Sequence, residues 1–164
     1  MREIERKFLV DEVPHRLDQC DRVHEIRQGY LLSEDSRELR IRRVGHRSRD
    51  EITVKKGEGV LRDELTIKVP RSETEHLWDA TIARLEKTRY ILDVLDSNQF
   101  AHLAELDIYK GDLEGLYVVE VEFEEESMNF DEFQPPEWFG REVTNDPDFK
   151  NKQLAFKSSR DLNL

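Results

Sequence analysis

Charged and apolar residues alternate with a period of two in short segments that recur along the 164-residue chain. This period is expected when successive side chains of a β-strand point to opposite faces of a sheet. Most of the segments are separated by Gly, Asp, Ser or Asn, and such short connections favour antiparallel pairing. The pattern predicts eight strands, at Arg2–Val10, Val23–Leu32, Arg37–Val44, Glu51–Lys56, Arg62–Val69, Glu86–Leu95, Ala101–Tyr109 and Gly115–Glu124.

Helical periodicity is confined to a few intervals of the chain. Residues Ser72–Leu85 begin with a serine suited to cap a helix and carry Glu75 three residues later. Their apolar positions fall along one stripe, so we expect this helix to cover one side of the sheet. Shorter helices are predicted at Pro14–Asp21, after Ser127 and at Asn151–Ser158.

The alternation separates charged from apolar side chains within each strand. Glu3, Glu5 and Lys7 share one side of the first strand, and apolar residues share the other. The later strands repeat this division, so one face is expected to be apolar and the other charged. A sheet that turns its charged face to water accounts for this pattern on composition alone. Paired glutamates in the first and last strands, with Arg40-Ile-Arg42 between them, favour instead a closed barrel with a charged interior and helices outside.

Charges inside a barrel are costly unless they are paired or bound to ions, so such an interior must hold water or a ligand. Carboxylates supply hard oxygen ligands that suit Mg²⁺ or Mn²⁺, and arginine and lysine suit several phosphate groups in a row. Together the two kinds of residue describe a polyphosphate with its metals. The acidic set is Glu3, Glu5, Glu64, Asp107, Glu120 and Glu122, and the basic set is Lys7, Arg40, Arg42, Lys55, Lys87 and Arg89.

Composition narrows the choice of partners. The net charge of −11 and the isoelectric point of about 5.0 oppose broad binding to nucleic acid or anionic lipid. No apolar run approaches the ~20 residues of a membrane span, and the start lacks the apolar stretch of a secretory signal. Cys20 is the single cysteine and can form no internal disulfide. We therefore expect one soluble cytoplasmic domain over residues 1–164, either monomeric or homodimeric, without nucleic-acid or membrane partners.

Eight charged motifs follow one another along the chain. They are Glu3-Ile-Glu5-Arg-Lys7, Arg27-Gln-Gly-Tyr30, Glu38-Leu-Arg40-Ile-Arg42, Thr53-Val-Lys55, Arg62-Asp-Glu64, Glu86-Lys87-Thr-Arg89, Glu105-Leu-Asp107 and Glu120-Val-Glu122. In this order and spacing the chain resembles the CYTH superfamily, also called the triphosphate tunnel metalloenzymes, and within it the short bacterial branch that resembles inorganic triphosphatases. The resemblance covers almost the whole sequence. It implies an α+β fold, a closed eight-stranded antiparallel β-barrel with helices packed outside.

The resemblance also implies a role for each charged set. The basic residues would hold a triphosphate, and glutamates of the first and last strands would hold Mg²⁺ or Mn²⁺. Glu64, Asp107 and Glu120 could instead orient waters or pair with the basic side chains. Tyr30 and Tyr90 are expected to pack between barrel and helix rather than to border the substrate. Whether the terminal residues Lys150 and Lys152 reach the charged interior is left open.

The implied activity is metal-dependent hydrolysis of the terminal phosphate of inorganic tripolyphosphate or a small organic triphosphate. Phosphoryl transfer depends mainly on positioning and charge neutralisation, and we expect Glu5, Arg42 and Lys55 to be catalytic. Two alternatives remain. In a class IV type adenylate cyclase a ribose hydroxyl would replace water as the nucleophile, and a non-catalytic module would bind polyphosphate or nucleotide without turnover. The short chain favours the hydrolase over the cyclase, and the full set of carboxylates argues against a pure anion-binding module.

Overall fold

The computed structural model describes residues 4–13, 17–34, 36–58, 61–123 and 132–162. All eight strands predicted from the alternation are present there, with ends that match the prediction or differ from it by at most three residues. They are β1 (Ile4–Leu9), β2 (Val23–Ser33), β3 (Arg37–Val44), β4 (Arg49–Glu58), β5 (Leu61–Pro70), β6 (Ala83–Leu95), β7 (Ala101–Tyr109) and β8 (Tyr117–Phe123).

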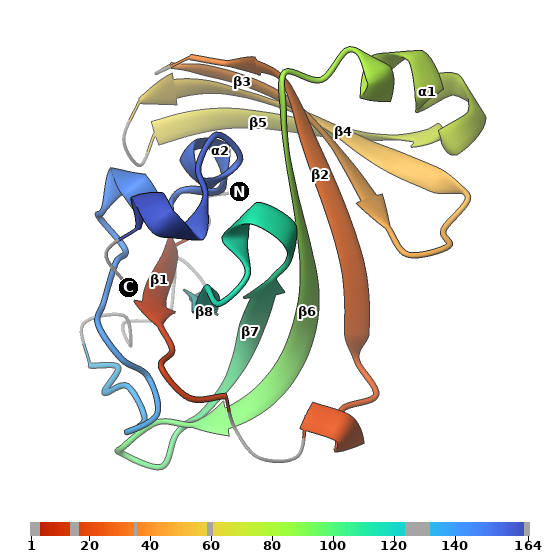
Figure 1. Ribbon diagram of the computed structural model, residues 1–164. Helices are drawn as coiled ribbons and strands as arrows, with labels where there is room; N and C mark the ends of the chain where they lie inside the picture. The colour runs from red at the N-terminus through yellow and green to blue at the C-terminus, as the bar shows by residue number, and fades with distance from the viewer. Residues whose placement is uncertain (1–3, 14–16, 35, 59–60, 124–131, 163–164) are drawn as a thin grey trace.

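The strands form one antiparallel sheet in the order β1-β8-β7-β6-β2-β3-β4-β5. Figure 1 shows that the sheet is strongly curved, with β3, β4 and β5 across the top of the view and α2 (Asn151–Leu154) inside the curve. The strands β1 and β5 lie at the two ends of the order and do not pair with each other within the described residues. The eight-stranded antiparallel architecture predicted from the sequence is therefore confirmed. The pairing of β1 with β5 that would close the sheet into a hydrogen-bonded barrel is not seen within the described residues.

The helices are shorter than the sequence predicts. Besides α2 they are α1 (Arg71–Asp79) and the 3₁₀ turns η1 (Leu17–Gln19), η2 (Gly111–Leu113), η3 (Pro147–Phe149) and η4 (Ser159–Asp161). The predicted helix Pro14–Asp21 is reduced to η1, with residues 14–16 outside the described residues. The predicted helix Asn151–Ser158 is reduced to α2, and residues 132–146 contain turns but no helix where one was predicted after Ser127.

The helix predicted at Ser72–Leu85 was wrong in its second half. The helix ends at Asp79, and the chain enters β6 at Ala83. The N–H of Ile82 donates to the Tyr30 carbonyl at 2.8 Å, which begins the pairing of β6 with β2. Pairing with a neighbouring strand therefore overrides the local helical pattern.

A buried carboxylate fastens α1 to the convex side of the sheet. Asp50 on β4 has no exposed surface and accepts hydrogen bonds from Arg43 Nε at 3.0 Å, Arg71 Nε at 2.9 Å and Thr74 Oγ1 at 2.5 Å. The Arg43 guanidinium also lies 4.4 Å from the ring centre of Trp78, which is the main buried apolar side chain of α1. These contacts fix the helix against β3 and β4, as the sequence predicts for one side of the sheet.

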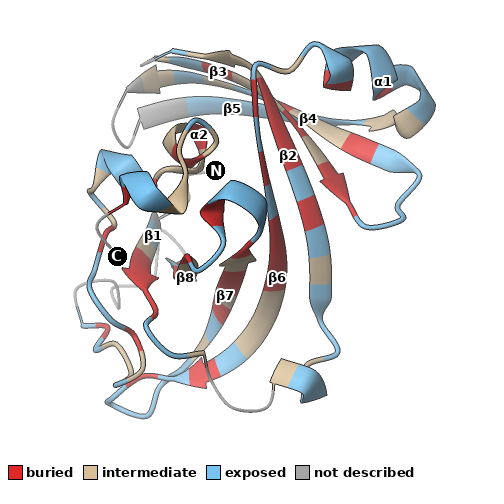
Figure 2. Cartoon of the chain, in the orientation of Figure 1, coloured by how far each residue is buried: buried red, intermediate tan, exposed pale blue. Residues whose placement is uncertain are grey.

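Two apolar clusters pack on opposite faces of the sheet. Phe8 on β1 belongs to the convex cluster and is covered by Phe133 and Phe139, which follow the last strand in the sequence. Figure 2 shows buried residues along β1, β2, β6 and β7, whereas β5 is exposed. The second cluster, on the concave face, contains Leu9, Tyr30, Leu85, Tyr109, Leu113, Leu116, Val118, Val143, Phe149, Leu154 and Leu162. The face that we predicted to carry the charges is therefore apolar at one end.

The C-terminal segment lies along the free edge of β1. The N–H of Gly140 donates to the Leu9 carbonyl at 2.8 Å, and the N–H of Val143 donates to the Lys7 carbonyl at 2.8 Å. A Cβ at Gly140 would lie 2.9 Å from the Leu9 oxygen, so only glycine allows this close approach. Within the described chain, none of the helices has the length and apolar character needed to cross a lipid bilayer.

Candidate active site

The strand register brings the predicted site residues onto the concave face. Residues that are opposite each other in neighbouring strands share a face, and the pairs Lys7–Glu120, Arg89–Asp107 and Lys55–Glu64 follow this rule. Glu3 lies outside the described residues. The residues that the register places on this face are Glu5, Lys7, Arg40, Arg42, Lys55, Glu64, Lys87, Arg89, Asp107, Glu120 and Glu122.

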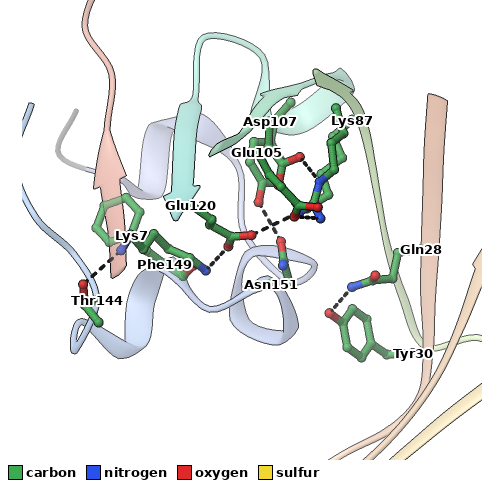
Figure 3. Close-up of polar contacts among 12 residues, drawn as sticks. Lys7, Gln28, Tyr30, Lys87, Glu105, Asp107, Glu120, Thr144, Phe149 and Asn151 are labelled. Carbon is green, nitrogen blue, oxygen red and sulfur yellow. Dashed lines mark hydrogen bonds and ion pairs between the residues drawn. The ribbon is translucent and has the colours of Figure 1, made fainter. Parts of the chain in front are cut away.

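Asp107 is the centre of a buried ion network on β6, β7 and β8. Its Oδ1 accepts Arg89 Nε at 2.6 Å, and its Oδ2 accepts Lys87 Nζ at 2.5 Å and Arg89 Nη2 at 2.7 Å (Figure 3). Asp107 and Lys87 are both almost fully buried. Of the roles predicted for Asp107, which were to bind metal, to orient waters or to pair with basic side chains, the structure therefore displays the pairing.

Glu120 joins β1 to this network. Its Oε1 lies 2.6 Å from Lys7 Nζ and its Oε2 lies 3.1 Å from Arg89 Nη2, while Glu105 accepts a further bond from Arg89 (Figure 3). Burial alone would raise the pKa of the Glu120 carboxyl, but the positive charges of Lys7, Lys87 and Arg89 lower it well below its ordinary value. Burial lowers the pKa of Lys87 to about 8 despite the opposing attraction of Asp107. The carboxylates and the cations of this network therefore neutralise each other's charges.

A second group of charges lies on β3, β4 and β5. Lys55 Nζ is 2.6 Å from Glu64 Oε2, and Arg40 Nη1 makes a longer contact of 3.4 Å with Glu38 Oε1. Burial acts to raise the pKa of Glu64, but the hydrogen bonds from Lys55 and Thr66 and the charges of Lys55 and Arg40 together outweigh it, so the pKa is lowered. This group is more open to solvent than the network around Asp107, because residues 63–68 of β5 are exposed. A ligand can therefore approach Lys55 from this side, whereas the Arg40 side chain is only 12% exposed.

Arg42 lies between the two groups and is held by a neutral side chain. Its Nε donates to Gln28 Oε1 at 3.1 Å, and Gln28 Nε2 donates to the Tyr30 hydroxyl at 2.6 Å. Burial, followed by the charges of Arg40 and Arg89, lowers the pKa of the Arg42 guanidinium. Gln28 was absent from the residues predicted for the site because a neutral amide adds nothing to a pattern of alternating charges. The register signal was present, since Gln28 lies opposite Arg42.

Tyr30 and Tyr90 agree with the packing interpretation. Tyr30 has no exposed surface, and its hydroxyl accepts the Gln28 amide within the concave apolar cluster. Tyr90 packs against the convex cluster, on the other face of the sheet. Lys152 Nζ donates to the Glu34 carbonyl at 3.0 Å, so the terminal helix contacts the turn between β2 and β3. The structure thereby gives Lys152 a backbone partner at the rim of the concave face.

Two carboxylates on neighbouring strands suit a divalent cation. Glu5 on β1 lies opposite Glu122 on β8, and like charges directly opposite each other in a sheet are unfavourable unless a cation joins them. Both side chains are exposed, and carboxylate oxygens are the ligands that Mg²⁺ and Mn²⁺ prefer. Within the described residues no group of three or more His, Cys, Asp or Glu side chains is arranged to hold a metal ion. Glu5 and Glu122 are therefore a pair of carboxylates that could hold a divalent cation together with ligands from the substrate or from further residues.

Known proteins resemble this chain along nearly all of its length. The profile of the CYTH domain matches residues 1–142. An inorganic triphosphatase of Nitrosomonas europaea is 43% identical over 159 residues, which cover 94% of this chain and 97% of that protein. An inorganic triphosphatase of Acetivibrio thermocellus is 30% identical over 94% of this chain and 93% of that protein. The crystal structure of the inorganic triphosphatase NE1496 is 40% identical, with a TM-score of 0.69 and coverage of 96% of both chains.

Proposed function

Because this chain belongs to the CYTH domain family, we propose that it is a triphosphatase that hydrolyses the terminal phosphate of inorganic tripolyphosphate. Two relatives that align along nearly its whole length are inorganic triphosphatases. The observation that carries the proposal is the shared face of Arg40, Arg42 and Lys55, on three positions of β3 and β4. Three cations in this arrangement suit the successive phosphates of one linear anion.

The basic side chains perform most of the chemistry in this proposal. A water molecule attacks the terminal phosphorus, the bond to the bridging oxygen breaks, and orthophosphate and pyrophosphate leave. Negative charge develops on the transferred group and on the leaving oxygen, and fixed cations stabilise it. We assign Arg42 and Lys55 to the transferred group, and Lys7, Arg40, Lys87 and Arg89 to the rest of the phosphate chain or to the positioning of its ligands.

Glu5 and Glu122 are the residues that we propose as metal ligands. They are opposed across β1 and β8, at the same side of the concave face as the Lys7–Glu120 pair. A bound Mg²⁺ or Mn²⁺ would neutralise phosphate oxygens and lower the pKa of a coordinated water. Glu64, Asp107 and Glu120 already pair with basic residues, so we propose that they orient those cations.

We propose further that the concave face is enclosed, as in the barrel predicted from the sequence. The support comes from the C-terminal segment rather than from pairing of β1 with β5. Residues 140–144 bond to β1, and Lys152 reaches the Glu34 carbonyl beside β3. The segment thus spans from one end of the sheet towards the other half and would exclude water from one side of a bound anion.

Product analysis of the purified protein tests this function. The protein is mixed with Mg²⁺ or Mn²⁺ and with tripolyphosphate, ATP or thiamine triphosphate, and orthophosphate, pyrophosphate and cyclic AMP are measured. We expect orthophosphate and pyrophosphate from tripolyphosphate, with kcat/KM reduced at least about 100-fold in Arg42→Ala. Arg27→Ala, on the convex side of the sheet, is the matched control and should retain activity. Cyclic AMP from ATP, or tripolyphosphate binding without turnover, would overturn the proposal.

A further inference from the structure

We propose that Gln28 is a positioning residue that holds Arg42 for a phosphate group without forming an ion pair with it. This inference rests on the proposed triphosphatase function and adds a residue that carries no charge and stands outside the predicted charged sets. Gln28 lies in the middle of β2, has no exposed surface, and has both ends of its amide engaged. Because it is hydrogen-bonded to both Arg42 and Tyr30, we assign it the role of holding Arg42 in place.

The chemistry of the partners fixes the orientation of the amide. An arginine Nε–H can only donate, so the amide oxygen must face Arg42 and the amide nitrogen must face Tyr30. The two distances, 3.1 Å from Arg42 Nε and 2.6 Å to the Tyr30 hydroxyl, fit this arrangement. A flipped amide would oppose its NH₂ group to the Arg42 donor. Gln28 is therefore held in one orientation by hydrogen bonding.

Tyr30 is the fixed end of the hydrogen-bonded chain Tyr30–Gln28–Arg42, which we call the relay. Its ring has no exposed surface and packs in the concave cluster with Leu85 and Leu154. A ring enclosed in this way cannot move without disturbing the packed core. The hydrogen bonds that link Tyr30, Gln28 and Arg42 thus fix the guanidinium relative to the packed core.

The relay leaves the binding end of Arg42 available. Because Nε–H is used by Gln28, the terminal Nη1 and Nη2 groups keep four N–H donors. These donors form the fork that binds a phosphate through two parallel bonds. Arg42 is therefore oriented through the donor that such a fork does not require.

Arg42 differs from the other cations of this face because its side-chain partner, Gln28, is neutral. Within the described residues, each of the others has an ion pair with a carboxylate, whereas Arg42 has none, including with Glu51, which lies opposite it on β4. A glutamate in place of Gln28 could accept the same bond but would neutralise the guanidinium. The amide thus preserves a full positive charge that an incoming phosphate can compensate.

Substitution of Gln28 by Glu and by Met separates charge from position. Gln28→Glu should keep Arg42 in place while neutralising it, and Gln28→Met should release it while keeping a similar side-chain volume. For both variants we expect KM for tripolyphosphate to rise about tenfold or more, because the lost contact contributes to binding, and kcat to fall as well, because Arg42 also faces the transferred group. Gln19→Glu adds the same charge on the exposed turn η1 and should leave KM unchanged.

A double-mutant cycle distinguishes positioning from a general structural role. In the Arg42→Met background, Gln28→Met should change KM less than about twofold, since its partner is already absent. A merely structural role would lower the midpoint of thermal unfolding and would raise KM by the same factor in both backgrounds. That additive result would overturn the inference, and so would an unchanged KM in both Gln28 variants of an active enzyme.

A binding measurement separates this inference from the proposed function. Titration calorimetry with tripolyphosphate in EDTA reports anion binding without turnover, so it applies even to a slow variant. Weaker binding by Gln28→Met, with wild-type binding by Gln19→Glu, supports the assignment. Wild-type protein that hydrolyses tripolyphosphate but shows no effect of Gln28 leaves the function intact and removes the relay. Wild-type protein that neither binds nor hydrolyses tripolyphosphate overturns both.

Discussion

The ammonium of Lys87 lies 2.5 Å from the Asp107 carboxylate, and neither side chain has any exposed surface. A buried ion pair of this kind is costly to break, because the charge that remains is left without water or a partner. Arg89 shares the same carboxylate through two further bonds. Asp107 therefore controls the position of two cations at once.

Asp107→Asn should destabilise the fold as well as the site. The amide keeps the shape but loses the charge that compensates Lys87 and Arg89, and we expect a loss of about 3–5 kcal/mol in the free energy of unfolding. Urea denaturation of the wild type and the variant measures this loss. Asp93→Asn is the matched control, since its bond to Arg22 is exposed and should contribute less than about 1 kcal/mol. Equal losses in the two variants would contradict the central role of Asp107.

The pKa of Glu120 makes stability depend on acid pH. In the folded protein the carboxyl stays ionised below its ordinary pKa of 4.5, whereas in the unfolded chain it takes up a proton near that value. The unfolded state therefore binds more protons as pH falls below about 4.5, and the stabilisation from Glu120 is lost as pH falls through the folded pKa. The free energy of unfolding between pH 7 and pH 3 should decrease in this window.

Glu120→Gln should reduce the slope of that decrease, because the variant has no carboxyl to titrate at this position. Glu137→Gln, on an exposed turn, serves as the control and should follow the wild-type curve. A slope that is the same in Glu120→Gln and the wild type would assign the acid sensitivity to other carboxylates.

The strands were predictable because burial and charge alternate at every second residue. Arg37–Val44 and Ala101–Tyr109 were predicted with the bounds that the structure has. The C-terminal end of α1 was not predictable, because the change from helix to strand before Ala83 depends on pairing with β2, which lies far away in sequence. A local pattern cannot report which distant strand will compete for its backbone hydrogen bonds.

The candidate site was predictable only in part, for a related reason. Alternation assigned Lys7, Arg42 and Asp107 to one face, and the register agrees. It could not show that Asp107 holds two cations or that Gln28 holds Arg42, because these partners come from different strands. Nor could it show that Leu9, on the same side as Lys7, closes one end of that face with an apolar cluster.

The pair Glu5 and Glu122 predicts a dependence on divalent cations. Removal of metal with EDTA should abolish hydrolysis, and added Mg²⁺ or Mn²⁺ should restore it. Glu5→Gln and Glu122→Gln should each raise the Mg²⁺ concentration for half-maximal rate about tenfold or more, since each removes one charged ligand. Isothermal titration with Mn²⁺ provides a readout that is independent of turnover. Glu86→Gln on the exposed convex side should leave both values unchanged.

From the contacts of Lys152 we expect this side chain to hold the C-terminal segment over the concave face. Its Nζ bonds to the Glu34 carbonyl, and Tyr109 donates to Asn151 at 2.6 Å beside it. Lys152→Met removes the first bond, which we expect to contribute about 1–2 kcal/mol locally. Amide hydrogen exchange in α2 should therefore become about tenfold faster or more, while exchange in β6 and β7 stays unchanged.

A matched substitution distinguishes this local opening from a loss of charge alone. Lys157→Met breaks an ion pair with Asp148 on the same segment, but Asp148 is largely exposed, so little protection should be lost. If the enclosure of the concave face depends on Lys152, the Lys152→Met variant should also bind tripolyphosphate more weakly than Lys157→Met does. Faster exchange in α2 without weaker binding would show that the segment is anchored there but does not contribute to the enclosure of the anion.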